Sequence, residues 1–430
     1  MSKSNQIKAI RGMNDILPGD TDLWLRVEAI CADLFDRYGY HQIRTPIVES
    51  TQLFARSIGA DTDVVAKEMY TFDDRNGDSL TLRPEGTASC VRAGIENGLF
   101  YNQQQRLWYV GAMFRHERPQ KGRYRQFSQL GAECYGWTSP DIEAELLGLV
   151  GQLFAALGLQ ETDLQLNSLG DTNARLNFKT DLVAYLQDYK DMLDEDSLRR
   201  LESNPLRILD SKNAAVQDVL LEAPIILDYL SDQSRDHFEA LQGYLSKLDI
   251  GFQVNPRLVR GLDYYNDTVF EWVNRDFGAQ ATVCAGGRYD GMVEQLGGPP
   301  TPCFGFAMGL ERLIQILQEQ AAAISNIEGK LNVFVISVGE LAREQALLIQ
   351  RDLVAAGISV QLHCGAGSMK NQFKKADKSG AKVALIIGEQ EAIDNKVAIK
   401  PLVRTDKLIE QKLIVQNEVF NAVTNLLESL

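Results

Sequence analysis

The sequence predicts an α+β protein: an antiparallel sheet with flanking helices, interrupted by a helical insertion and followed by a separate α/β domain. Three observations predict this class. Residues 107–134 alternate polar and apolar positions in two runs joined by a short connection, which is typical of an antiparallel hairpin. Residues 168–245 are rich in leucine and acidic residues at helical spacing. The last hundred residues alternate strand-like and helix-like segments.

The first predicted domain opens with a helix and continues as strands. Apolar side chains recur at three-and-four spacing over residues 20–38, and Gly39 follows as a stop. The strand runs cover residues 107–114 and 123–134. We assign residues 1–167 to the first part of this domain, because 430 residues exceed what one hydrophobic core usually supports.

A helical insertion is predicted over residues 168–245. Helical periodicity is clearest in residues 182–201 and 216–230. Strand-like sequence with many glycines returns afterwards and leads into an apolar helix that begins near Leu310. We therefore assign residues 246–325 to the second part of the interrupted domain.

The last predicted domain covers residues 331–430, after a loose alanine-rich stretch at residues 321–330. Residues 331–338 and 381–388 are apolar enough for strands buried on both faces. An amphipathic helix is predicted between them, over residues 342–356.

Composition excludes several classes of protein. The net charge of −14 argues against sequence-blind coating of nucleic acid, so any such contact must use local basic patches. No apolar run is long enough to span a bilayer, and the polar N-terminus lacks an export signal. We expect a cytoplasmic protein without a membrane partner.

Cysteine and histidine usage gives no sign of a structural metal. The six cysteines are scattered without a C-x-x-C pair, and there are only four histidines. We interpret the cysteines as small buried hydrophobic residues.

Candidate chemistry concentrates in the predicted hairpin. A period of two puts two arginines, an aromatic ring and two further polar groups on one strand face, beyond a charged pair that ends the preceding strand. These residues are Arg123, Arg125, Phe127, Gln129 and Glu133, with Arg115 and Glu117 before them. A solvated sheet face is the ordinary alternative. However, guanidinium groups bind phosphate bidentately and an aromatic ring stacks on a purine. No P-loop motif occurs, so a nucleotide site here would be built from arginines and carboxylates.

A second candidate feature is a run of lysines in the last domain. Lys370, Lys374, Lys378 and Lys382 recur every four residues, with Lys375 beside them. On a helix they would form a basic stripe. The alternative is a solvated helix face.

Three stretches resemble the motifs of class II aminoacyl-tRNA synthetases, and they occur in that family's order. Residues 114–118 (Phe-Arg-His-Glu-Arg), with 123–127 and 131–133, resemble motif 2. Thr45 and Pro46 resemble the proline of motif 1 at a dimer interface, and residues 305–312 resemble motif 3.

Two more stretches are similar to histidine-specific signatures: Leu-Val-Arg-Gly-Leu-Asp-Tyr-Tyr at 258–265 and Ala-Gly-Gly-Arg-Tyr-Asp-Gly at 285–291. The sequence is thus identified as a member of the histidyl-tRNA synthetase family, of the bacterial type. The resemblance implies a six-stranded antiparallel catalytic sheet, a C-terminal anticodon-binding domain and a homodimer. It also implies ATP-dependent activation of L-histidine and its transfer to the 3′ end of tRNA(His).

The resemblance implies specific roles for matched residues. Arg115 and Arg260 would be catalytic, at the α-phosphate. The implied ATP-binding residues are Arg115, Glu117, Arg123, Phe127 and Arg312. Mg²⁺ is expected with ATP. The implied histidine-binding residues are Glu85, Gly86, Thr87, Arg115, Gln129, Glu133, Arg260, Tyr264 and Tyr265. The implied tRNA-binding residues are Arg118 and Gln120 near the acceptor end, and Lys370, Lys374 and Lys378 on the anticodon side. By analogy, the insertion would clamp the acceptor stem.

Two alternatives remain open. The protein could be a related class II synthetase for proline, threonine or glycine, which residues 260–265 oppose. It could instead resemble the synthetase-like regulatory subunit of ATP phosphoribosyltransferase, which binds histidine without aminoacylation. Arg115, Arg260, Arg312 and residues 331–430 oppose that interpretation.

Overall fold

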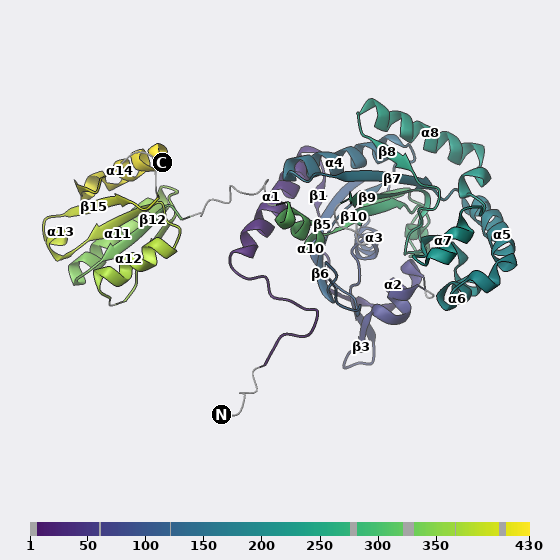
Figure 1. The fold of residues 1–430 in the computed structure, drawn as a ribbon, viewed down its shortest axis with the longest axis horizontal. Coiled ribbons are helices and arrows are strands. Elements are labelled where there is room, and N and C mark those ends of the chain that lie inside the picture. The colour runs from purple at the N-terminus through teal and green to yellow at the C-terminus, as the bar shows by residue number, and fades with distance from the viewer. Residues whose placement is uncertain are drawn as a thin grey trace. The chain divides into compact units, whose positions relative to one another are not determined.

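A computed structural model describes residues 7–59, 62–120, 122–275, 282–320, 331–365, 367–403 and 410–430. The chain forms two compact units, Met1–Ile324 and Ser325–Leu430, each drawn in Figure 1. The predicted connection at residues 321–330 lies outside the described residues. In the described part of the chain, no helix is both long and apolar enough to cross a membrane.

The first unit is built on a large sheet with the strand order β1-β5-β6-β11-β10-β9-β7-β8. Its six inner strands are antiparallel to one another. They are β5 (Gln105–Phe114), β6 (Gln126–Tyr135), β11 (Cys303–Gly309), β10 (Thr282–Arg288), β9 (Asn266–Asn274) and β7 (Thr162–Ser168). Two short edge strands, β1 (His41–Gln42) and β8 (Phe252–Val254), pair in parallel. The predicted six-stranded antiparallel sheet is confirmed and is two strands wider than expected.

Helices cover one face of this sheet and enclose the main hydrophobic core. They are α1 (Asp20–Arg37), α4 (Asp141–Leu157), α8 (Asp232–Lys247) and α10 (Leu310–Glu319). Helix α1 confirms the first predicted helix: Leu23, Val27, Cys31 and Phe35 form its buried stripe. In Figure 1, α4 and α8 lie along the same side of the sheet.

The other face carries a second apolar cluster and leaves room for a cavity. The helices that contribute to it are α3 (Thr87–Glu96), α5 (Thr172–Asp188), α6 (Glu195–Ser203), α7 (Ala214–Leu220) and the short α9 (Met292–Gln295). A small sheet of β2 (Val48–Ser50), β4 (Ser79–Leu82) and β3 (Tyr70–Asp73) lies with α2 (Thr51–Ile58) beside it.

The two helical runs expected within residues 168–245 are shorter than their periodicity predicts. The first is two helices, because the Asp194 side chain accepts from the Ser197 amide and starts α6 afresh. The second ends at Leu220, shortly before Pro224, whose missing N–H and fixed φ disfavour a continued helix.

The second unit is a five-stranded sheet in the order β13-β12-β14-β15-β16. Strands β12 (Val333–Ser337), β13 (Val360–Leu362) and β14 (Val383–Ile387) are parallel, whereas β15 (Lys396–Pro401) and β16 (Lys412–Val415) are antiparallel. Three helices pack on one face: α11 (Glu340–Ala355), α13 (Glu389–Ile393) and α14 (Val419–Ser429). Helix α12 (Met369–Lys378) packs on the other. The predicted buried strands and the helix between them are confirmed.

The centre of the large sheet depends on close backbone approach at Gly286. A Cβ there would lie far inside contact distance of the Gly305 carbonyl oxygen on β11. We expect Gly286→Ala to destabilise the first unit by about 1–3 kcal/mol, because overpacking forces the strands apart. Calorimetry should show a lower midpoint for this unit. Gly243→Ala, in an open position on α8, is the control and should be neutral or stabilising by up to about 1 kcal/mol. Equal midpoints for Gly286→Ala and the parent would contradict the argument.

Candidate active site

A cavity of about 770 Å³ lies against the sheet face opposite α1 and α4. Most of the site residues expected from the sequence line it, although they come from segments far apart in the chain. The expected residues in its lining are Glu85, Thr87, Arg115, Glu117, Arg123, Phe127, Gln129, Arg260, Tyr264, Tyr265 and Arg312. The cavity therefore brings together arginines, carboxylates, an aromatic ring and uncharged hydrogen-bonding groups.

One end of the cavity is formed by the β5–β6 hairpin. The Arg115 guanidinium lies over the Phe127 ring, 5.4 Å from its centroid, and its Nε donates to the Pro84 carbonyl at 2.9 Å. Glu117 lies 3.9 Å from Arg115 and 3.5 Å from Arg123. Both guanidiniums thus share Glu117 in loose ion pairs that a phosphate could replace, and that of Arg115 also lies over a ring face.

Arg125 does not line the cavity, unlike Arg123, Phe127 and Gln129. Strand β6 begins at Gln126 rather than Arg123, although the Arg115 amide still donates to the Arg125 carbonyl at 2.9 Å. Instead, the Arg125 amide donates to the Gly12 carbonyl at 2.7 Å, and its Nε donates to the Glu117 carbonyl at 3.3 Å. Arg123 reaches the cavity from a tight turn closed by hydrogen bonds to Gln120.

Arg260 comes from the segment between β8 and β9, and Arg312 comes from the first turn of α10. Arg260 donates to Glu271 of β9, whose other oxygen accepts from the Thr282 hydroxyl at 2.8 Å. Arg312 donates to the Thr282 carbonyl. The Nε atoms of both arginines are buried, and neither has a hydrogen-bond partner among the described residues. Each guanidinium therefore retains donor capacity for a ligand.

A second end of the cavity offers acceptors. The Glu85 carboxylate accepts from the amides of Thr87 and Ala88, at 2.7 and 2.8 Å, and thereby caps α3. Burial raises the pKa of Glu85. Gln129 is 8% exposed, lines the cavity, and its Oε1 has no partner among the described residues. Because an unpaired buried oxygen is costly, Gln129 is suited to accept from a ligand donor.

Glu133 lies beneath the cavity and is fully buried. Its Oε1 accepts from the hydroxyls of Thr87 at 2.8 Å and Tyr109 at 3.2 Å, and its Oε2 accepts from Tyr289 at 2.6 Å. A carboxylate has about four acceptor positions, so about one remains for a ligand. Gly305 lies so close that a Cβ there would collide with this carboxylate.

Three tyrosines surround this region. Tyr264 packs on Tyr265, with 4.5 Å between ring centroids, and on Tyr289 at 5.6 Å. Tyr289 carries no role in the sequence prediction although it belongs to the 285–291 signature. Gly86 serves the same region indirectly, because a Cβ there would collide with the Tyr109 ring.

Two arginines of the helical segment form a further wall of the cavity, and no sequence pattern indicated them. Arg200 and Arg207 line the cavity, and the Arg207 guanidinium lies beside Gly261, next to Arg260. Burial lowers the pKa of Arg207, as do the neighbouring Arg200 and Arg260, while Asp210 opposes the shift. This wall is suited to an anion.

The residues expected to meet tRNA lie outside the cavity. Arg118 and Gln120 are exposed in the hairpin connection, where Lys121 lies outside the described residues. Lys370, Lys374 and Lys378 are exposed on α12. Lys382 is not part of this helical stripe, because α12 ends at Lys378 and Lys382 lies just before β14.

An antiparallel sheet with an arginine- and carboxylate-lined cavity, together with a separate α/β unit, defines a class II aminoacyl-tRNA synthetase fold. A family model described as histidyl-tRNA synthetase matches residues 12–313, and one described as an anticodon-binding domain matches residues 332–426. The chain therefore belongs to the histidyl-tRNA synthetase family. This confirms the resemblance seen in the sequence, and with it an aminoacyl-tRNA ligase as the class of enzyme.

Solved structures agree with this placement. The chain is similar to the apo histidyl-tRNA synthetase of S. aureus, with 36% identity and a TM-score of 0.80 over 97% of this chain and 100% of that chain. The histidyl-tRNA synthetase of Nostoc sp. PCC 7120 shares the fold at 21% identity and a TM-score of 0.70, over 98% and 100% of the two chains. A Bacillus halodurans protein described as an ATP phosphoribosyltransferase regulatory subunit/histidyl-tRNA synthetase shares it at 19% identity and 0.66, over 90% and 98%.

Glu133 should make stability depend on pH. Burial raises its pKa to about 8, against the hydroxyls of Tyr289 and Thr87, whereas an unfolded glutamate titrates near 4.3. Its favourable contribution is thus complete below about pH 4.3 and is lost as pH rises towards 8. Glu133→Gln removes this titration. The thermal midpoint of the variant, measured against that of the parent at the same pH, should therefore rise between pH 5.5 and 8. The difference in unfolding free energy should grow by roughly 1 kcal/mol per pH unit. A difference that is constant over this range would mean that Glu133 is already ionised at pH 5.5.

Proposed function

We propose that this chain activates L-histidine with ATP to histidyl-adenylate and transfers histidine to the 3′ end of tRNA(His). The observation that carries the proposal is the single cavity in which Arg115, Arg260 and Arg312 converge with the free acceptor of Gln129. One part of that set suits a polyphosphate, and the other suits an amino acid.

In the activation step, the histidine carboxylate attacks the α-phosphate and pyrophosphate leaves. Negative charge develops between the two, so positioning and charge stabilisation dominate the catalysis. Arg115, just after β5, and Arg260, in the segment before β9, act as the catalytic residues. Arg123 and Arg312 bind the phosphate tail, Phe127 stacks on the adenine and Glu117 binds its amino group.

Histidine is recognised at both of its polar ends. Glu85, Thr87 and Gln129 provide acceptors for the α-ammonium group, with Gly86 shaping the turn before α3. Tyr264, Tyr265 and the remaining acceptor position of Glu133 serve the imidazole. Buried polar groups of this kind reject substrates that cannot pair with them.

The tRNA meets several surfaces in this proposal. Arg118 and Gln120 lie at the acceptor end, and the wall of Arg200 and Arg207 extends a basic surface from the helical segment. Lys370, Lys374 and Lys378 serve the anticodon side, which their exposure on α12 supports.

Residues 1–167 and 246–325 form the catalytic domain, residues 168–245 the insertion and residues 331–430 the anticodon-binding domain. Mg²⁺ accompanies ATP and neutralises its outer phosphates; among the described residues, no cluster of three or more histidine, cysteine or acidic side chains forms a metal site. The enzyme acts in the cytoplasm as a homodimer, which the exposed Ile47 and Val48 after motif 1 support.

Amino-acid-dependent exchange of pyrophosphate into ATP tests the proposed activation step. With each of the twenty amino acids supplied in turn, we expect exchange with histidine only, because the imidazole must satisfy buried polar groups. Exchange with proline, threonine or glycine would place the chain with a related synthetase. Histidine binding without exchange would favour a regulatory protein.

The lysines of α12 offer a separate test of tRNA binding. Replacing Lys370, Lys374 and Lys378 by glutamine should weaken aminoacylation and leave pyrophosphate exchange intact, because only the transfer step uses tRNA. Each lost phosphate contact should flatten the slope of log affinity against log salt by about 0.7–0.9. Glutamine at Arg343, Arg351 and Lys412, which are exposed on α11 and β16, removes the same charge elsewhere. If both triple variants bind tRNA alike, α12 is only a solvated helix.

A further inference from the structure

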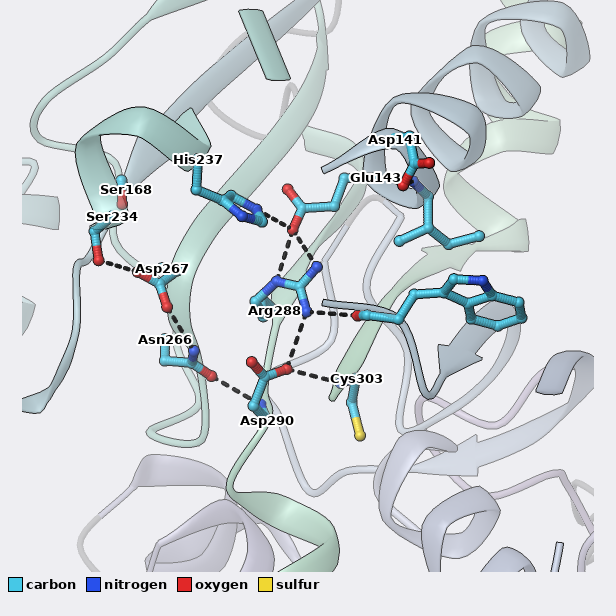
Figure 2. Close-up of polar contacts among 12 residues, drawn as sticks. Asp141, Glu143, Ser168, Ser234, His237, Asn266, Asp267, Arg288, Asp290 and Cys303 are labelled. Atoms are coloured by element: carbon cyan, nitrogen blue, oxygen red, sulfur yellow. Dashed lines mark hydrogen bonds and ion pairs between the residues drawn. The ribbon is translucent and has the colours of Figure 1, made fainter. Parts of the chain in front are cut away.

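A ring of polar groups, with Arg288 and Glu143 buried at its centre, lies behind the cavity and begins and ends on α8 (Figure 2). His237 of α8 contacts Glu143 of α4 at 2.8 Å, and Glu143 binds Arg288 at the end of β10. From Arg288, contacts run through Asp290, Asn266 and Asp267 to the Ser234 hydroxyl, one turn before His237. The ring therefore joins α4, α8 and the ends of two sheet strands.

Arg288 is the centre of this ring. It is 2% exposed, and its guanidinium donates to Glu143 from Nε at 2.7 Å and to the Trp137 carbonyl and Asp290 from Nη1 at 3.1 and 3.2 Å. Glu143 is fully buried. Burial alone would raise the pKa of Glu143, but Arg288 and His237 hold it below its ordinary value. The pair is thus a charged one, fixed by several hydrogen bonds.

The residue between Arg288 and Asp290 is Tyr289, which points the other way. Its hydroxyl donates to Glu133 at 2.6 Å, and its amide donates to the Cys303 carbonyl at 2.9 Å. Asp290 in turn accepts from the Cys303 amide at 2.7 Å. The side chains of Arg288 and Asp290, on either side of Tyr289 in the chain, are therefore both anchored in the ring. Tyr289 thus has little freedom to move away from Glu133.

We infer that Arg288 is a positioning residue for the amino-acid end of the cavity: it fixes Tyr289, and through Tyr289 the orientation of the Glu133 carboxylate. His237 and Ser234 extend this frame to α8. The inference rests on the proposed function, because the group that Glu133 orients is the imidazole of histidine.

The test is Arg288→Lys in the full chain, which keeps a positive charge beside Glu143 but loses the forked geometry. In pyrophosphate exchange we expect the KM for histidine to rise about tenfold, while the KM for ATP changes less than twofold. Loss of folded protein alone would lower kcat and leave both KM values unchanged, which would overturn the inference. Arg106→Lys is the matched control, because Arg106 binds Glu145 of the same helix bidentately at 2.9 and 3.1 Å. It should leave both KM values unaltered.

A second variant and a hydrogen-exchange measurement test the same inference independently. If Arg288→Lys does not fold, Ser234→Ala removes one link of the ring and should raise the KM for histidine two- to threefold; no change overturns the inference. Hydrogen exchange of the peptide containing Tyr289 and Asp290 needs no substrate. It should speed up in whichever ring variant folds and stay unchanged in Arg106→Lys. If the parent protein shows no histidine-dependent pyrophosphate exchange, the proposed function is refuted. If hydrogen exchange is unchanged in the ring variants, the positioning of Tyr289 is refuted.

Discussion

The burial of one carboxylate, that of Glu133, constrains much of the first unit. An acidic group without solvent needs hydrogen-bond donors, and these are hydroxyls from α3, β5 and the end of β10. Each donor needs space in turn. The Tyr109 ring fits only because Gly86 and Gly131 have no side chain. The Glu133 carboxylate fits only because Gly305 has none either. Several glycines of this sheet are therefore explained by one acid rather than by turns.

The cavity also explains how an acidic protein can hold a polyanion. Three of its guanidinium groups have carboxylate partners: Arg115 and Arg123 share Glu117, and Arg260 is bound by Glu271. These carboxylates keep the arginines ordered and partly neutralised without a ligand. A phosphate would exchange one anionic partner for another, so the site need not create and then desolvate unpaired charge.

The parts of the fold and of the cavity that depend on local sequence pattern could be predicted. The hairpin, the strand face with Phe127 and Gln129, and the helices α1 and α11 all follow from periodicity. Arg125 does not line the cavity; its amide donates to the Gly12 carbonyl and its Nε to the Glu117 carbonyl. Glu271, Tyr289 and Arg207 were missed for another reason. Their significance lies in partners distant in the chain, such as Glu133 for Tyr289, and no spacing rule reports such pairings.

The distribution of thiols has a practical consequence. All six cysteines are free, and five of them are buried; only Cys364, shortly before α12, is exposed. Burial raises the pKa of each of the five and keeps the nucleophilic thiolate scarce. A maleimide dye would therefore react at one position of the native protein. The unaltered chain carries its own attachment point for a fluorophore, next to the helix whose lysines we assign to tRNA.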